Sequence, residues 1–557
     1  MYLDAKRAAR RQQQGRSRIV SIPAPTGGLN TRDSLDQMEP TDAVVMDNMI
    51  PSIGKVSLRK GYEDFVTGIA ADIGGTWAAD EIETLFTLVV GSNEQFLCAM
   101  DGGIARIDSG TAVEIEPDGT YTSDRWQYTT FQDATSGQPK ILAVNGTDTP
   151  WTYDGTTHAA WAFEEDNGSG GTQAVTEENF VWVTTFKNRV FLGEANSRDF
   201  YYGQLGAIPG AGSTTTMITK FPLSGIRGAQ GNILFMGALT RDTGSGPDDF
   251  AVFVTDQGQV IVYQGSNPGD AAAWSIVGVY KIPKPINSRR AHAQLFGDIV
   301  IATELDYIFL NAALRESGAV ILTPTKMTGA LSSAAASHKD NYGWEMVISE
   351  TDNLLISNIP RQTNAQYHQH VFNLQTRAAS RFTGLNFRTF AVWNGKLYGA
   401  TNNAVYRVLS RLSDDASTGE DPIQMRVQTA WTDLQSAEIK HVKAMRALLR
   451  SQGAFSYGAK VGVDFIDPQV SVKASAGPTS ETTLWGDAPG VTTLWGDTAA
   501  TQTYWAGTTT ASPASAREWR LLSGRGSDFC LSLSADVKDQ LVDWLSTDYK
   551  LHLSGRF

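Results

Sequence analysis

Short apolar segments alternate with turn residues along most of the chain. From residue 77 onward, strand-sized apolar stretches recur at intervals of about 8 to 15 residues and are separated by Gly, Asp and Asn. Residues 95–100, for example, are followed by Asp101-Gly102-Gly103 and then by 104–107, which is typical of strand, tight turn, strand. The same pattern predicts strands at 141–144, 151–153, 180–186, 190–192, 251–255, 260–263, 294–303, 308–310, 389–393, 397–400 and 405–408.

Consecutive hairpins of similar length, with hardly any helical periodicity, favour the radial repetition of small sheets. We therefore predict a mainly β protein in which residues 76–425 form a β-propeller-like repeat of hairpins. A series of β-sandwiches is the alternative, because it would produce a similar pattern of strands and turns. We expect an additional β platform domain built from the N- and C-terminal segments.

The N-terminal platform segment, residues 21–75, is expected to contain one short helix. Pro40 and Thr41 are typical of a helix start, with Thr41 as the N-cap, and Pro51 would end the helix. The apolar residues between them, Ala43, Val44, Met46 and Ile50, would face the edge of the β-domain.

The C-terminal domain, residues 426–557, begins with longer alternating strands at 425–434 and 440–450. Residues 476–515 form an excursion that is poor in charge and repeats Thr-Thr-Leu-Trp-Gly-Asp. Its tryptophans, Trp485, Trp495 and Trp505, are spaced by ten residues. They would either pack on their own propeller or act as an intersubunit contact or a gate, and the sequence leaves both interpretations open.

Composition excludes several classes of protein. The chain has 557 residues, 53 of them Gly, and its apolar runs are strand-sized, so we expect no membrane span. The N-terminus lacks the apolar core of a secretory signal. The only two cysteines, Cys98 and Cys530, lie in apolar patterns and are expected to be buried thiols rather than a disulfide framework.

Charge is distributed unevenly along the chain. Residues 1–20 form a basic arm in which six Lys and Arg residues accompany the single acid Asp4, whereas the remaining chain carries 40 basic and 58 acidic residues, a balance of −18. An acidic body repels nucleic acid, because phosphate contacts require Lys and Arg. The arm is either a solvated terminus or a docking element.

No motif of a catalytic or cofactor site is present, so we predict that the protein is not an enzyme and has no cofactor, metal site or catalytic residue. His368 and His370 alternate in a strand-like segment and could share a face, but with no third ligand nearby they are interpreted as polar surface residues. Asp248 and Asp249 could supply paired carboxylates, but their Gly/Pro-rich surroundings favour a turn.

The segment from Gly27 to Gly61 resembles the N-terminal signature of podophage tail proteins of the nozzle, or tail tubular protein B, type. The resemblance rests on Gly27-Gly-Leu-Asn30, Leu35, residues 42–48, Pro51, Gly54 and Arg59-Lys-Gly61, and covers about the first 65 residues. More loosely, the style of the chain is similar to phage hub or packaged-DNA stabilisation proteins.

This resemblance implies a virion protein of the phage tail, assembled in the host cytoplasm as a homo-oligomeric ring. The ring is expected to be a hexamer that attaches to a tail adaptor and in some cases to tail fibres, retains packaged DNA and conducts double-stranded DNA at ejection. The residues expected at the adaptor or portal interface are Lys6, Arg7, Arg10, Arg11, Gly27, Gly28, Asn30, Asp47, Asn48, Pro51, Arg59 and Gly61. Two alternatives stay open: a receptor-binding or polysaccharide-cleaving tail protein, and a propeller scaffold outside phages.

Overall fold

A computed structural model describes residues 17–553, apart from 135–136, 227–229, 243–246, 316–330, 332–335, 363–365, 417–418, 452, 454, 467–470, 477–513 and 517–518. The chain divides into two compact units. Unit 1 comprises residues 1–28, 34–60 and 420–557, and unit 2 comprises residues 29–33 and 61–419. Each unit is described by itself.

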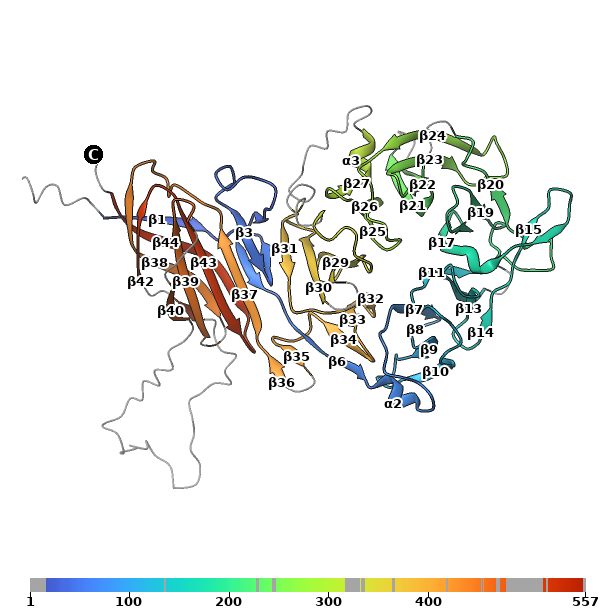
Figure 1. The fold of residues 1–557 in the computed structure, drawn as a ribbon, viewed down its shortest axis with the longest axis horizontal. Helices are drawn as coiled ribbons and strands as arrows, with labels where there is room; N and C mark the ends of the chain where they lie inside the picture. The colour runs from blue at the N-terminus through green and yellow to red at the C-terminus, as the bar shows by residue number, and fades with distance from the viewer. Residues whose placement is uncertain are drawn as a thin grey trace, which may run out of the picture. The chain divides into compact units, whose positions relative to one another are not determined.

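Unit 2 is a β-propeller in which small antiparallel sheets follow one another around a ring (Figure 1). The first sheets contain β7 (Thr84–Val90), β8 (Asn93–Met100), β9 (Gly103–Arg106) and β10 (Val113–Glu116), then β11 (Gln127–Gln132), β12 (Pro139–Val144), β13 (Trp151–Tyr153) and β14 (His158–Ala160), then β17 (Phe180–Phe186), β18 (Arg189–Glu194), β19 (Phe200–Tyr202) and β20 (Thr219–Phe221). The next contain β21 (Ile233–Asp242), β22 (Pro247–Thr255), β23 (Gln259–Gly265) and β24 (Trp274–Lys281), then β25 (His292–Leu295), β26 (Asp298–Ala302) and β27 (Tyr307–Phe309), then β28 (Glu345–Ser349), β29 (Leu354–Gln362), β30 (Gln366–Asn373) and β31 (Ala379–Phe382).

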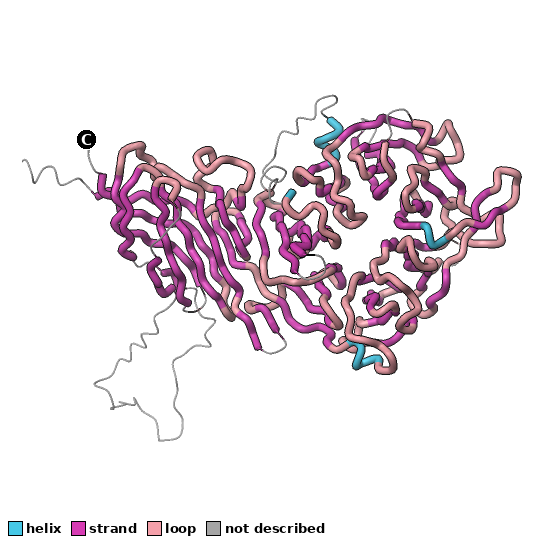
Figure 2. The backbone as a smooth tube through the Cα atoms, in the orientation of Figure 1, coloured by secondary structure: helices cyan, strands magenta, loops and turns pink. Residues whose placement is uncertain are grey.

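The last propeller sheet contains the first strand of the unit. It joins β32 (Thr389–Trp393), β33 (Lys396–Ala400) and β34 (Ala404–Val408) to β6 (Tyr62–Thr67), which pairs antiparallel with β34. The strands β35 (Asp414–Ala416) and β36 (Gly419–Asp421) extend this sheet, and a separate hairpin is formed by β15 (Glu164–Asp166) and β16 (Thr172–Ala174). Helical segments are α2 (Ile69–Ile73), η1 (Glu177–Asn179) and α3 (Leu310–Arg315). Figure 2 shows how strands dominate the described chain.

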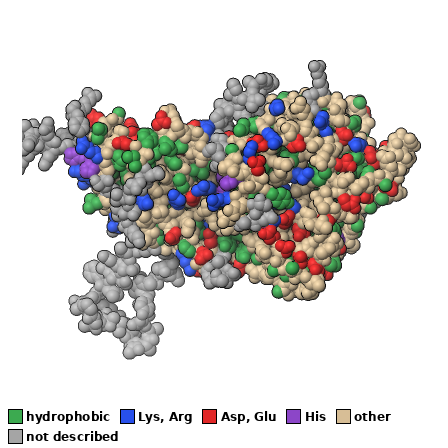
Figure 3. Space-filling view, viewed as in Figure 1, with side chains coloured by type: hydrophobic (Ala, Val, Ile, Leu, Met, Phe, Trp, Pro, Cys, Tyr) green, Lys and Arg blue, Asp and Glu red, His purple; other side chains and the backbone are tan. Residues whose placement is uncertain are grey.

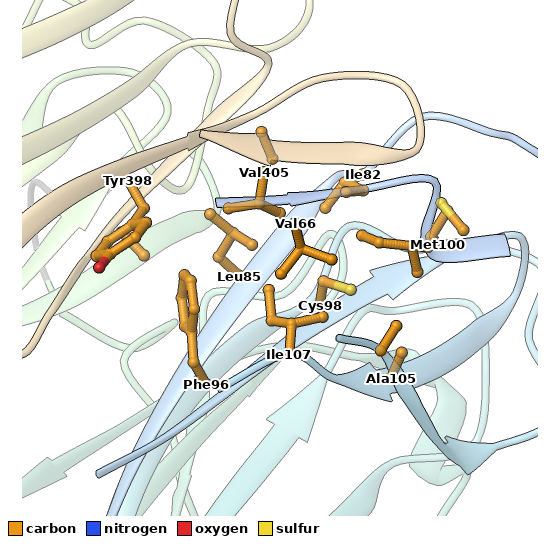
Figure 4. Close-up of a cluster of buried hydrophobic side chains, with 14 of the residues drawn as sticks. Val66, Ile82, Leu85, Phe96, Cys98, Met100, Ala105, Ile107, Tyr398 and Val405 are labelled. Carbon is orange, nitrogen blue, oxygen red and sulfur yellow. The ribbon is translucent and has the colours of Figure 1, made fainter. Parts of the chain in front are cut away.

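A buried cluster joins the last sheet of the propeller to the sheet that begins at β7 (Figure 4). Val66 of β6 and Val405 of β34 lie in this cluster with Leu85, Phe96 and Cys98 of β7 and β8. The ring of Phe96 also stacks on that of Trp393, with centroids 5.3 Å apart. Because the two sheets come from opposite ends of the propeller sequence, this apolar contact closes the ring.

These observations confirm the predicted mainly β fold and the propeller. The propeller nevertheless starts earlier than residue 76, since β6 and α2 already belong to unit 2. The strand predicted at 294–303 is divided by a turn, in which Phe296 and Gly297 both have positive φ, into β25 and β26. Cys98 and Cys530 are buried free thiols, as expected.

Unit 1 is built from strands near both ends of the chain. One sheet joins β1 (Ser17–Pro23), β4 (Met49–Ser52), β5 (Lys55–Leu58), β38 (Lys440–Ser451), β41 (Ala514–Ala516), β42 (Arg520–Gly526) and β44 (Val542–Leu553). A second set of strands contains β3 (Asp42–Asp47), β37 (Ile423–Thr429), β43 (Phe529–Val537), β39 (Phe455–Val463) and β40 (Ser471–Ala476). The short strand β2 (Gly28–Leu29) precedes β3 in the chain. Alternating burial along β37 and β38 gives each sheet an apolar inner face.

The helix predicted at residues 41–50 is wrong. Residues 42–47 form strand β3, which pairs antiparallel with β37 through Met46 opposite Val427 and Asp47 opposite Arg426. The β-branched Val44 and Val45 are better suited to a strand, and the available ladder of β37 outweighs the local cap signal at Thr41. The platform built from both terminal segments is observed, but as strands throughout this region.

The closing cluster predicts a large cost for truncating Phe96. The Phe96→Ala variant is expected to lose about 3–5 kcal/mol of stability, because a fully buried ring leaves a cavity between two sheets. Urea unfolding followed by tryptophan fluorescence measures the loss. In the matched control Val89→Ala, on the neighbouring strand β7 but 56% exposed, stability should change by no more than about 0.5 kcal/mol. Equal effects of the two substitutions would contradict the role of this cluster.

Candidate functional site

The glycines of the N-terminal signature form a tight turn. The N–H of Gly27 donates to the carbonyl of Thr41 at 2.8 Å, and Gly28 has a φ of 89°. A Cβ atom on Gly27 would lie 2.2 Å from Oδ1 of Asp42. The close approach of these two segments explains why this turn requires a residue without a side chain.

Asn48 and Arg59 form a buried polar pair in unit 1. The Nε of Arg59 donates to Oδ1 of Asn48 at 2.9 Å, and the amide of Asn48 donates to the carbonyl of Gln424 at 2.8 Å. Both residues are 1% exposed, and Asn48 has a φ of 61°. Asparagine tolerates this left-handed conformation and also supplies the acceptor for the guanidinium, so one residue serves both requirements.

The remaining signature residues also have structural contacts. Pro51 lies in β4 opposite Val56, and Asp47 is 6% exposed. Oδ1 of Asn30 accepts hydrogen bonds from the backbone N–H groups of Arg32 and Asp33, which forms a local turn. The side chains of Asp47, Asn48 and Arg59 are therefore interior groups that shape the segment; they could support a partner surface but not contact it.

Gly61 marks the point where the main segment of unit 2 begins. Its N–H donates to the carbonyl of Arg411 at 2.7 Å, and its carbonyl accepts from the N–H of Ser410 at 3.0 Å. A Cβ atom here would lie 1.9 Å from the carbonyl oxygen of Ser413. The predicted arm residues Lys6, Arg7, Arg10 and Arg11 and the tryptophans Trp485, Trp495 and Trp505 lie outside the described residues.

An arginine hub lies where the inner strands of the propeller begin. Arg290, just before β25, has a side chain only 11% exposed. Its guanidinium donates to the carbonyls of Glu83 and Trp126 and to the hydroxyls of Thr84 and Thr389, and it pairs with Glu345 at 3.6 Å. These partners lie at the starts of β7, β11, β28 and β32 or directly before them. One side chain thus bridges five sheets of the ring.

Further charged groups extend the hub. Arg125 donates to the carbonyl of Trp344 at 3.2 Å and lies over the ring of Tyr342, while Arg388 pairs with Glu81 and Glu83. Burial raises the pKa of Glu83 although Arg125 and Arg290 oppose the shift. Because one guanidinium reaches five sheets, side chains span the propeller axis at this end of the ring.

Asp124, which precedes Arg125 of the hub, is a carboxyl whose ionisation is disfavoured by burial. Burial raises its pKa to about 7, and the nearby carboxylates of Glu83, Asp80 and Asp101 add to the shift. The N–H of Gly102 donates to Oδ2 of Asp124 at 3.2 Å, which partly opposes it. Sequence reasoning missed the hub, because its members are scattered over 300 residues and only ring closure brings them together.

A polar pocket of about 540 Å³ lies on the sheets of β7–β10 and β11–β14. Its lining includes Glu116, Tyr121, Asp148, His158 and Glu178. Nδ1 of His158 lies 3.0 Å from Glu116, and the carboxylate of Asp148 accepts from the backbone N–H groups of residues 122 and 123. Burial lowers the pKa of His158 although Glu116 opposes the shift. The pocket is acidic overall and suits a cationic group.

His368 and His370 are buried, so their interpretation as surface residues is wrong. They lie on β30, which is paired on both sides by β29 and β31, and Nδ1 of His370 lies 3.1 Å from the hydroxyl of Tyr307. The ring of His338 contacts that of His368, with centroids 5.3 Å apart. Burial lowers the pKa of His368 to about 3. His368 and His370 are therefore neutral core groups.

The paired carboxylates considered at Asp248 and Asp249 do not lie in a turn, because β22 begins at Pro247. Oδ1 of Asp249 accepts a hydrogen bond from the hydroxyl of Thr240 on the neighbouring strand. Within the part of the chain that the structure describes, no group of three or more His, Cys, Asp or Glu side chains is arranged to hold a metal ion. Among the same residues, no helix has the length and apolar character needed to cross a membrane.

Gly61→Ala is expected to destabilise the protein by more than about 2 kcal/mol, because its methyl group would overlap a backbone carbonyl that cannot move away freely. Thermal unfolding followed by circular dichroism provides the measurement. Gly225→Ala is the matched control, since no described atom lies within 4 Å of the place that its Cβ would take and its φ is not positive. A Gly61→Ala protein as stable as this control would show that the entry turn tolerates a side chain.

Asp124 is expected to make the propeller less stable as pH rises. The pKa of Asp124 is higher in the folded than in the unfolded state. Its protonated carboxyl therefore adds up to about 4 kcal/mol to the free energy of unfolding below about pH 4, and this contribution is lost as pH rises through about 7. The Asp124→Asn variant should lack this component. The test measures the urea unfolding midpoint of each protein at pH 5 and 7.5. The control is Glu350→Gln, which replaces an exposed carboxylate. Parallel pH profiles for the wild type and Asp124→Asn would refute it.

Comparisons with known proteins return distant matches to solved structures. No protein-family model matches the sequence, and the comparison with curated proteins returned no match. Among solved structures, the chain is similar to BBS1N in complex with ARL6DN, at 8% identity and a TM-score of 0.38 over 64% of this chain and 99% of that one. Raptor from Chaetomium thermophilum has 14% identity and a TM-score of 0.35 over 63% of this chain and 29% of that one. An exo-β-1,3-galactanase from Phanerochaete chrysosporium has 10% identity and a TM-score of 0.28 over 88% and 100%. Similarity at this level carries no argument about function.

Proposed function

We propose that this protein is a structural subunit of the tail of a short-tailed bacteriophage, of the nozzle or tail tubular protein B type. The subunits form a ring, expected to be a hexamer, that attaches to the tail adaptor, retains packaged DNA and conducts it at ejection. The protein acts in the virion as a structural component and not as an enzyme. The signature from Gly27 to Gly61 carries the proposal.

The position of the signature in the fold supports this proposal. Gly27 and Gly28 form the turn that leads into β2 and is bonded to Thr41 just before β3. Asn48 and Arg59 hold the β4–β5 hairpin from inside, and Gly61 begins the main propeller segment. A subunit that bears a propeller is also what the resemblance implies. Several residues that carry the resemblance thus shape the segment of unit 1 that precedes the propeller and the point where the propeller segment begins.

The hub restricts where a DNA channel could lie in such a ring. Arg290 and its partners bridge the inner strands of the propeller at one end, so duplex DNA would pass between subunits and not through the propeller axis. The acidic composition of the body is consistent with a surface along which phosphates slide without being held. The assignment of Trp485, Trp495 and Trp505 to an intersubunit contact or gate remains a prediction.

Negative-stain imaging of the purified protein with and without adaptor-bearing capsids tests the function. Six-fold rings are expected, either alone or on the capsid. Replacing Lys6, Arg7, Arg10 and Arg11 by alanine should reduce attachment to the capsid at least tenfold, because the arm would lose four of its six positive charges. The control replaces four exposed propeller lysines, Lys220, Lys281, Lys284 and Lys396, and should attach normally. A monomer or trimer that never joins the capsid would overturn the proposal.

A further inference from the structure

The sheet of unit 1 that contains β38 and β44 presents a basic outer face. In the register of these strands, His441 lies opposite His552 on one side and Arg525 on the other, and Arg446 lies opposite Asp548. Alternating burial along β38 turns His441, Arg446 and Arg450 outward. Figure 3 shows His, Lys and Arg side chains gathered at the end of unit 1 where β1, β38 and β42 lie.

Six Lys and Arg side chains lie on this basic face, with two carboxylates among them. The basic residues are Lys55, Lys443, Arg446, Arg450, Arg525 and Lys550, and the acidic residues are Asp543 and Asp548. The carboxylates are paired, since Asp543 lies 3.1 Å from Nζ of Lys55 and Asp548 lies 3.0 Å from Nε of Arg446. The face therefore has an excess of four positive charges on a chain whose net charge is −13.

Large apolar side chains are exposed among these charges. Ile19 on β1 is 58% exposed and lies opposite Lys550, and Leu521 on β42 is 82% exposed and lies opposite Ala444. Trp519 is 36% exposed and packs under the guanidinium of Arg446 at 4.9 Å. The exposed aliphatic side chains of Ile19 and Leu521 among these charges favour a protein partner, because contacts to DNA phosphates are made by charged and polar groups.

The complementary charge is carried by the other unit of the same chain. Unit 2 has 24 basic and 39 acidic residues, a balance of −15, whereas unit 1 has 22 basic and 20 acidic residues. The imbalance is concentrated in residues 61–270, which include 9 basic and 28 acidic residues. These residues form the sheets from β7 to β23 and line the acidic pocket with Glu116, Asp148 and Glu178.

We propose that the basic face of one chain docks on the acidic propeller sheets around Glu177 and Glu178 of a second copy. The contact joins two different surfaces, and repeated in the same direction it generates a ring when the rotation closes. The acidic pocket receives a Lys or Arg side chain of the neighbouring copy. This docking deepens the proposed function by naming the surfaces that join the subunits. That the resulting ring belongs to a phage tail rests on the proposed function.

The dimensions of the face are adequate for such a contact. β38 has 12 residues, which corresponds to a length of roughly 40 Å, and four neighbouring strands span roughly 15–20 Å. The resulting area of roughly 600–800 Å² is close to what each partner buries in a standard protein interface. The exposed Ile19 and Leu521 would supply its apolar part, and the surrounding charges would select the acidic partner.

Sedimentation velocity of the full-length chain at low and high salt tests the proposal. The wild type is expected to associate at about 50 mM salt. Its dissociation constant should be at least tenfold higher at about 500 mM salt, because exposed charges are screened. Lys443→Glu/Arg450→Glu should be monomeric, and so should Glu177→Lys/Glu178→Lys. An equimolar mixture of the two variants should associate again, since each variant supplies the intact surface that the other lacks.

The matched control is Lys396→Glu/Lys538→Glu, which makes the same change in net charge away from the face and should associate like the wild type. The proposal is overturned by a wild type that stays monomeric at all concentrations, by association that survives Lys443→Glu/Arg450→Glu, or by a mixture of the two disabled variants that stays monomeric. It is also overturned if the face variant loses only binding to a DNA duplex of about 30 base pairs or to anionic vesicles, because the occupant is then a nucleic acid or a lipid surface. Failure of capsid attachment with these associations intact would reject the proposed function alone.

Discussion

The propeller ring closes because β6, from the beginning of unit 2, becomes part of the sheet formed by β32, β33 and β34 near its end. A ring of small sheets leaves two exposed edges until its first and last sheets meet. The apolar cluster around Val66, Phe96 and Val405 packs the composite sheet against the one that follows it. The positions of the remaining sheets, and of the side chains at the axis, depend on this closure.

Ring closure also explains the polar hub. The inner strands begin at the same end of the propeller, so their first residues converge although they are distant in sequence. Arg290 donates to several carbonyls and hydroxyls that converge at this end, and Glu345 lies beside its charge. The raised pKa of Asp124 is a consequence of the same burial, since convergence places several carboxylates in one poorly hydrated region.

The difference in charge between the two units gives each a separate task in the proposed assembly. An acidic propeller repels nucleic acid, while the basic face of unit 1 is suited to an acidic protein surface. Joining unlike surfaces of identical chains gives a directional contact, which is required for a ring with more than two members. The same charges set the direction of docking, because two basic faces repel each other and so do two acidic propellers.

Local signals are enough to define the fold class, because turn residues and the alternation of apolar and polar positions can be recognised within a few residues. Hairpins such as 95–107 and 389–400 are therefore predicted close to their observed bounds. The strand at 42–47 is not predicted, since its pairing with β37 involves residues almost 400 positions away and outweighs a local cap signal. The burial of His368 and His370 and the convergence on Arg290 follow from the tertiary structure alone. Burial depends on which sheets pack together, and the residues of one segment do not predict that packing.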